Sequence, residues 1–231
     1  YRAYIELGNF LSIDSAMTNI KKLSIIHSAE YENIHRVHSY IPNDPFINQQ
    51  CSLDAVKAYD AWGLWDIENG ELPGSEDVLL ASVDSGVQWD HPDLVENIWQ
   101  NLGEDADGDG RTIEFIDGEW VLDPGDLNGN DDDGNTYTDD LIGWDPSGIS
   151  GGDDNDPNTQ NHSHGTHVAG TLAATTDNGV GVAAAAFNSR IIPVKCTRDN
   201  NNEETINDGY PGILYASKAG YYAGTFTIVN C

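Results

Sequence analysis

Basic residues are scarce in this chain. Its 231 residues include only 10 Lys and Arg against 39 Asp and Glu, so the formal net charge is −29 at pH 7. Binding to nucleic acid depends on clustered Lys and Arg that neutralise phosphates and release counterions, and ten such residues cannot supply that surface. Attraction to anionic lipids requires the same kind of basic cluster. The composition therefore excludes nucleic acid and the membrane surface as expected partners.

Cysteine is also scarce. The three cysteines are Cys51, Cys196 and Cys231. This number rules out a disulfide framework and leaves at least one thiol unpaired. We expect Cys196 and Cys231 to lie reduced on neighbouring strands, with Cys196 buried as a small hydrophobic residue.

Long apolar runs are missing as well. The most apolar stretch, residues 180–187, is far shorter than the ~20 residues that a membrane-spanning helix needs. The chain begins with Tyr1 rather than Met, and we do not expect its first residues to be a signal peptide. We therefore expect it to be a piece of a longer precursor.

The remaining composition suits a folded protein, because 39% of the residues are hydrophobic and six are Trp. Apolar residues recur at helical spacing in four segments: 13–23 (with Ser12 or Asp14 as its cap), 53–62, 164–174 and 213–219. Short runs typical of strands occupy four others: a polar one at 31–40 and apolar ones at 78–84, 191–196 and 226–230.

Strands that alternate with helices predict an α/β fold, with a mostly parallel sheet covered by helices on both faces. Residues 1–41 should form a small separate α+β unit, because two prolines bracket Asn43 and Asp44 just after it.

Acidic residues concentrate in one insert. Between Glu104 and Asp156 there are 18 acids and a single base, Arg111. Such a block either repels itself and stays disordered, or is neutralised by bound cations.

Two polar residues stand where parallel sheets gather their catalytic groups. Asp84 ends the predicted strand 78–84, and the carboxyl ends of parallel strands carry the ligands and reacting groups of such folds. His164 begins a predicted helix, where the positive end of the helix dipole disfavours the imidazolium and keeps the ring available as a base. A carboxylate is needed to orient that ring, so this pair predicts acid–base chemistry.

The surrounding sequence resembles one family. The segments ASVDSGV at 81–87 and DHPDL at 90–94 are similar to the aspartate region of subtilisin-like serine peptidases, and HSHGTHVAGT at 162–171 is similar to their histidine region. The resemblance covers about residues 45–231. It implies a partial subtilisin-like sheet in which Asp84 is the triad aspartate and His164 the triad base. Residues 1–41 resemble the C-terminal part of the inhibitory propeptide, which lies in the substrate cleft.

The family's nucleophile has no counterpart in this chain. Subtilisin-like triads run Asp, His, Ser, and the serine follows the histidine by roughly 150 residues in a Gly-Thr-Ser motif. Only 67 residues follow His164, and no Gly-Thr-Ser occurs. The resemblance thus implies a secreted serine endopeptidase acting on proteins or peptides, while residues 42–231 end before its Ser and its oxyanion-hole Asn. We expect the chain alone to be inactive.

The acidic insert predicts calcium, because oxygen ligands without Cys or clustered His suit a hard cation. Two loops partly match the EF-hand pattern, in which alternate oxygens surround the ion. The expected ligands are Asp105, Asp107 and Asp109 in the first loop and Asp131, Asp133 and Asp140 in the second. The first loop has Ile116 where the twelfth-position acid should stand.

The family resemblance implies one more calcium site, formed by Asp93 and by Asp177 in the loop 175–179. A different reading of the whole chain also stays open. The chain could be a non-catalytic calcium-binding or interaction module, a pseudo-peptidase. The downstream reading frame separates the two, since only the enzyme requires a segment with the nucleophile.

Overall fold

The computed structural model describes residues 12–28, 39–148, 152–159, 162–199 and 205–231. The chain divides into two compact units, residues 1–37 and 38–231. In the first, helix α1 spans Ile13–Ile20, and the Ser12 hydroxyl caps it by accepting a hydrogen bond from the Ser15 amide at 3.2 Å. The predicted helix is confirmed with Ser12 as its cap, but it ends at Ile20 rather than at Leu23. Most of the strand expected at 31–40 lies outside the described residues.

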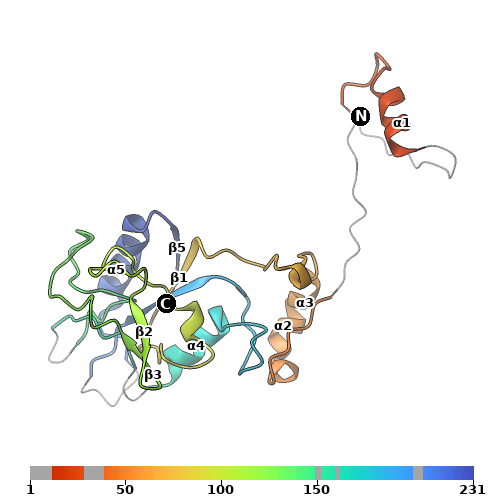
Figure 1. Ribbon diagram of the computed structural model, residues 1–231. Coiled ribbons are helices and arrows are strands. Elements are labelled where there is room, and N and C mark those ends of the chain that lie inside the picture. The colour runs from red at the N-terminus through yellow and green to blue at the C-terminus, as the bar shows by residue number, and fades with distance from the viewer. Residues whose placement is uncertain (1–11, 29–38, 149–151, 160–161, 200–204) are drawn as a thin grey trace. The chain divides into compact units, whose positions relative to one another are not determined.

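A three-stranded parallel sheet forms the centre of the second unit (Figure 1). Its strands are β1 (Val78–Asp84), β4 (Arg190–Lys195) and β5 (Phe226–Asn230), in the order β4-β1-β5. β1 pairs in parallel with both neighbours, and its last residue, Asp84, lies opposite Lys195. The central strand is buried because it is covered on both edges and both faces. This confirms the three apolar strands predicted from the sequence.

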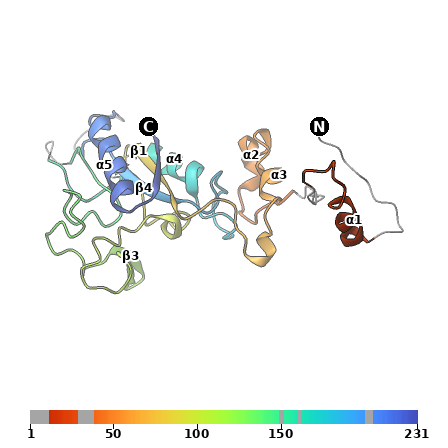
Figure 2. The same cartoon turned by 90° about the horizontal axis from the view of Figure 1, so that it is seen from above.

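Helices cover both faces of this sheet (Figures 1 and 2). Helix α4 (His164–Ala173) connects β1 to β4, and α5 (Gly209–Tyr222) connects β4 to β5. Leu80 packs in one apolar cluster with residues of α4, whereas Leu79, Ala81 and Val83 pack in another with residues of α5. Alternate residues of a strand point to opposite faces. The predicted α/β architecture is therefore confirmed.

Two short helices replace the single helix predicted over 53–62. They are α2 (Cys51–Ala55) and α3 (Ala58–Trp62), and Lys57 between them adopts a left-handed conformation with φ of 62°. A left-handed residue cannot continue a right-handed helix. A third apolar cluster, which includes Trp62 and Phe187, joins these helices to the segment before β4. Short 3₁₀ turns complete this part of the fold: Ile47–Gln49, Ile67–Asn69 and Val95–Asn97.

The acidic insert is ordered around a hairpin that the sequence did not reveal. Strands β2 (Ile113–Ile116) and β3 (Glu119–Leu122) pair antiparallel and lie at the periphery of the unit (Figure 2). Single bridges join β4 to the segment before the insert, through Ile98 and Ile191, and to the insert itself, through Trp144 and Val194.

The cysteines are free thiols, with Cys196 buried and the other two exposed. The burial of Cys196 was predicted. The expectation that Cys196 and Cys231 follow neighbouring strands is wrong, because β1 lies between β4 and β5. Among the described residues, no helix is long and apolar enough to cross a membrane.

Candidate active site and cation clusters

Asp84 and His164 meet where the central strand ends and α4 begins. The Nδ1 atom of His164 lies 2.7 Å from Oδ1 of Asp84. The Asp84 side chain is 9% exposed, whereas that of His164 is 61% exposed. A buried carboxylate on one ring nitrogen and a solvent-facing ring form the arrangement that a carboxylate-oriented base requires.

Close packing of α4 on β1 sets this distance. The Asp84 carboxylate also accepts a hydrogen bond from the Ser85 amide at 2.7 Å, and the Ser85 hydroxyl accepts one from the Gly165 amide at 3.0 Å. A Cβ added to Gly165 would stand 2.2 Å from the carbonyl oxygen of Gly86 and 3.2 Å from Asp84. Only glycine lets the first turn of α4 approach the strand so closely.

The family follows from a sequence comparison. The model of the subtilase family matches residues 75–216, which include Asp84, His164 and more than half of the chain. The chain belongs to the subtilase family. As a subtilase chain it is related to serine proteases, and the α/β fold described above is consistent with that membership.

Individual relatives are similar over most of this chain. The thermophilic serine proteinase of Bacillus sp. (strain AK1) is 28% identical over 219 residues, which cover 94% of this chain and 39% of that protein. The extracellular basic protease of Dichelobacter nodosus is 31% identical over 189 residues, which cover 79% of this chain and 26% of that protein. This subtilase chain thus spans about two-fifths or less of either relative. A solved structure described as proteases from Pseudoalteromonas arctica PAMC 21717 is 26% identical in sequence, with a TM-score of 0.44. The match covers 76% of this chain and 44% of the chain in that structure.

Asp93 of this subtilase chain is buried beside the loop that follows α4. Its Oδ2 accepts a hydrogen bond from the Val182 amide at 2.8 Å, and its Oδ1 accepts one from the Asn178 side chain at 3.1 Å. Asp44, also buried, accepts hydrogen bonds from the Asp177 amide at 3.0 and 3.1 Å. Burial raises the pKa of both Asp44 and Asp93. Two buried acids next to one loop suit a cation, and sequence reasoning missed Asp44 because it reads as a turn residue.

Asp177, the other acid expected at this calcium site, contacts the segment that precedes Asp44. Its carboxylate accepts hydrogen bonds from the Tyr40 hydroxyl at 2.6 Å and from the Asn43 amide at 2.9 Å. These contacts direct it to the 40–43 segment. Because Asp177 follows α4, these contacts place Tyr40 near the C-terminal end of that helix. Helix α4 is about 15 Å long, and His164 lies at its opposite end.

The second acidic loop brings together Glu104, Asp133 and Asp140, whose ligand atoms lie within 4.8 Å of one another. Burial raises the pKa of Glu104 to about 7 and that of Asp140 to about 8. Asp131, expected to join them, instead accepts hydrogen bonds from the backbone amides of residues 134–136. Glu104 was missed because it lies outside the Asp-rich pattern.

The first acidic loop forms two clusters rather than one. Asp105 and Asp107 lie with Asp126, and Asp107 and Asp109 lie with Asp123, each set having ligand atoms within 4.8 Å of one another. The three predicted acids are thus divided between two groups. Asp123 and Asp126 were missed because each is a single acid beyond the hairpin.

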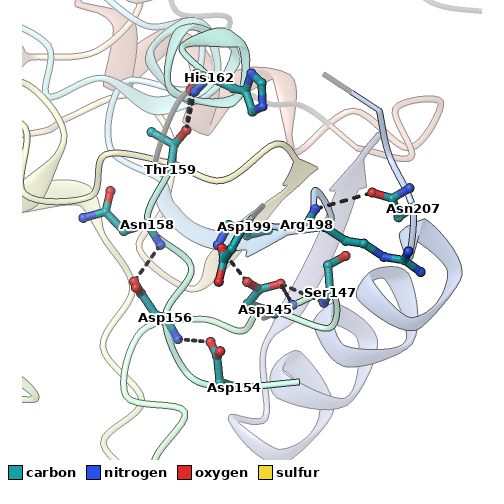
Figure 3. Close-up of polar contacts among 12 residues, drawn as sticks. Asp145, Ser147, Asp154, Asp156, Asn158, Thr159, His162, Arg198, Asp199 and Asn207 are labelled. Atoms are coloured by element: carbon teal, nitrogen blue, oxygen red, sulfur yellow. Dashed lines mark hydrogen bonds and ion pairs between the residues drawn. The ribbon is translucent and has the colours of Figure 1, made fainter. Parts of the chain in front are cut away.

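A buried lysine occupies a fourth acidic cluster, close to Asp84. The Nζ atom of Lys195 lies 2.8 Å from Oδ2 of Asp145 and also contacts Asp199. Figure 3 shows Asp145 and Asp199 facing each other, with Asp154 on the neighbouring loop. Burial disfavours the charged amine, but its hydrogen bonds to both carboxylates outweigh this and raise the pKa of Lys195. An ammonium group of the chain itself therefore offsets one of the negative charges in this cluster.

Proposed function

We propose that the protein is a serine endopeptidase and that Asp84 and His164 are two members of its triad. His164 takes the proton of the attacking serine hydroxyl, and Asp84 holds the ring and stabilises the imidazolium that forms. The 2.7 Å contact between Nδ1 and the buried carboxylate is the observation that carries this proposal. The substrates are proteins or peptides, as expected of a peptidase family.

We assign the nucleophile to a segment outside these 231 residues. The nearest serine in sequence to the triad aspartate is Ser85, which is 3% exposed and whose hydroxyl accepts the hydrogen bond from Gly165. A buried hydroxyl engaged in helix packing cannot attack a substrate. Ser85 is therefore excluded as the group that His164 activates, and the proposal places that group in the missing segment.

A fluorophosphonate probe, which labels activated serines, tests this assignment. The purified 231-residue chain should not be labelled, whereas the protein extended by the missing segment should be. His164→Ala should abolish the labelling of the extended protein, and Gly170→Ala, on the same helix, should preserve it. A labelled serine within residues 1–231 would refute the assignment. A downstream stop codon in place of an open frame would instead favour the calcium-binding module.

We further propose calcium as a cofactor, held by Asp44 and Asp93 at one site and by Glu104, Asp133 and Asp140 at another. The second site fits a cation because Oε2 of the buried Glu104 has no hydrogen-bond partner among the described residues. Calcium prefers such carboxylate and carbonyl oxygens. It would tie the insert and the loop after α4 to the sheet.

Residues 1–41 are proposed to be the end of an inhibitory propeptide, and the mature enzyme is proposed to be secreted. One relative is named an extracellular protease, which supports secretion. The propeptide proposal predicts that a peptide of residues 1–41, added to the active enzyme, inhibits it competitively. Noncompetitive inhibition, or none, would contradict it.

A further inference from the structure

A short turn at residues 123–126 faces the first acidic loop. Asp126 is fully buried, and its Oδ1 accepts hydrogen bonds from the Ala106 amide at 2.8 Å and the Asp107 amide at 3.3 Å. Its Oδ2 is buried without a hydrogen-bond partner among the described residues. One oxygen of Asp126 thus fixes the backbone of the loop, while the other requires a partner that the described chain does not supply.

Asp123 repeats this arrangement at the other end of the turn. It is 3% exposed, and its Oδ1 accepts a hydrogen bond from the Gly125 amide at 2.6 Å. Its Oδ2 is also buried without a partner within the described part of the chain. Burying a polar oxygen without a partner is unfavourable, and burying a charged oxygen is more so. Two such oxygens in one turn are available to coordinate a cation.

Asp107 lies between these two buried acids. Its ligand atoms are within 4.8 Å of those of Asp105 and Asp126 in one cluster, and within 4.8 Å of those of Asp109 and Asp123 in the other. Its Oδ2 is also packed against the turn, because a Cβ added to Gly125 would stand only 2.4 Å from it. The glycine leaves the space that the Asp107 carboxylate fills.

We propose that the first acidic loop binds two neighbouring calcium ions that share Asp107 as a bridging ligand. Asp105 and Asp126 complete the first site, and Asp109 and Asp123 complete the second. All the side-chain ligands are carboxylate oxygens, which suit a hard divalent cation. A carboxylate has two oxygens with about four lone-pair positions, so Asp107 can serve both ions.

Charge supports two ions rather than one. The five carboxylates carry five negative charges, and Arg111, whose Nε lies 3.2 Å from Asp109, offsets one of them. Two divalent ions balance the remaining four. A single ion would leave two negative charges uncompensated around two largely buried acids, which is unfavourable in a poorly solvated site.

This arrangement differs from the single EF-hand ion that the loop pattern predicts. An EF-hand closes its coordination with an acid at the twelfth position of the same loop, where this chain has Ile116. Here the closing acids, Asp123 and Asp126, follow strand β3. The ions therefore cross-link the segments that enter and leave the β2–β3 hairpin, and the order of the hairpin should depend on them.

Counting the calcium ions bound to the purified protein by native mass spectrometry tests the proposal. Asp107→Asn should lose two ions relative to the parent protein, whereas Asp105→Asn and Asp109→Asn should lose one each. The control Asp117→Asn removes an equal charge from the exposed tip of the hairpin, where Asn tolerates the observed φ of 54°, and should lose none. Ions at the other acidic sites contribute equally to every variant and cancel in the comparison.

If Asp107→Asn misfolds, the double variant Asp105→Asn/Asp109→Asn still tests whether there are two sites. Two separate sites predict that this double variant loses two ions, the sum of its single losses. A loss of only one ion in the double variant would show a single EF-hand-like site and overturn the proposal, as would unchanged counts in all variants. These counts are independent of peptidase activity, so their failure leaves the triad assignment untouched.

Discussion

Gly165 offers a direct test of how the fold positions the base. We predict that Gly165→Ala destabilises the folded chain and impairs the complete enzyme, although it adds only one methyl group. The new Cβ would stand 2.2 Å from the Gly86 carbonyl oxygen. Carbon and oxygen atoms in close contact are normally about 3.3–3.6 Å apart. The start of α4 must therefore move away from β1 by about 1 Å.

The magnitude follows from this displacement. Overpacking of a well-packed contact typically costs about 1–3 kcal/mol of stability. The same movement lengthens the 2.7 Å contact between His164 and Asp84. Because a misplacement of about 1 Å can cost on the order of 10²-fold in rate, we expect kcat/KM of the complete peptidase to fall by about that factor. KM should change less, since the histidine acts mainly in the chemical step.

Denaturant unfolding and peptide hydrolysis measure the two effects. The matched control is Gly170→Ala, on the same helix, where the nearest atom to an added Cβ is a Val182 methyl at 3.9 Å. That control should retain activity and gain up to about 1 kcal/mol, since alanine is the better helix former. The reasoning is refuted if Gly165→Ala matches Gly170→Ala in both stability and activity.

Three further predictions follow from other parts of the fold. Burial raises the pKa of Cys196 to about 12. Iodoacetamide at pH 9 should therefore label the two exposed cysteines of the native protein and leave Cys196 unmodified, and equal labelling of all three would contradict this. Lys195→Met should lower the free energy of unfolding, measured with denaturant, by about 3–5 kcal/mol because it leaves the buried charge of Asp145 uncompensated. Adding Asp145→Leu should recover much of that stability, and no recovery would show that the loss comes from packing rather than from charge. Strand β5 is one edge of the described sheet, and it exposes Phe226 (82%) and Ile228 (58%). The 231-residue chain should therefore self-associate, which light scattering would detect as a molar mass above that of the monomer. A strictly monomeric chain would contradict that expectation.

Elements defined by local pattern could be predicted from the sequence. Strand β1 matches its predicted range, 78–84, because a short apolar run bounded by glycines has few other stable conformations. The helix that begins at His164 was equally clear. The helix at 53–62 was not, since the left-handed Lys57 that divides it gives no sign in the periodicity of its neighbours.

The cation clusters could be predicted only in part, because their members come from distant segments. The acids at 105, 107 and 109 are visible as a repeated local pattern. Asp44, Glu104 and Asp126 become candidate ligands only when the fold buries them beside other acids. Lys195 ends an apolar strand and gave no signal at all, since its partners at positions 145 and 199 belong to no common motif.

The buried ammonium of Lys195, which lies opposite Asp84 in the sheet, gives Asp145 and Asp199 a counterion that belongs to the chain itself. An amine that is part of the polypeptide cannot be extracted by a chelator or diluted away. Removal of the proposed calcium ions should therefore loosen the peripheral hairpin and the loop after α4, while the ion pairs of Lys195 beside Asp84 stay in place. If the proposed calcium ions are removed and then added back, the strand end that carries Asp84 should keep its structure throughout.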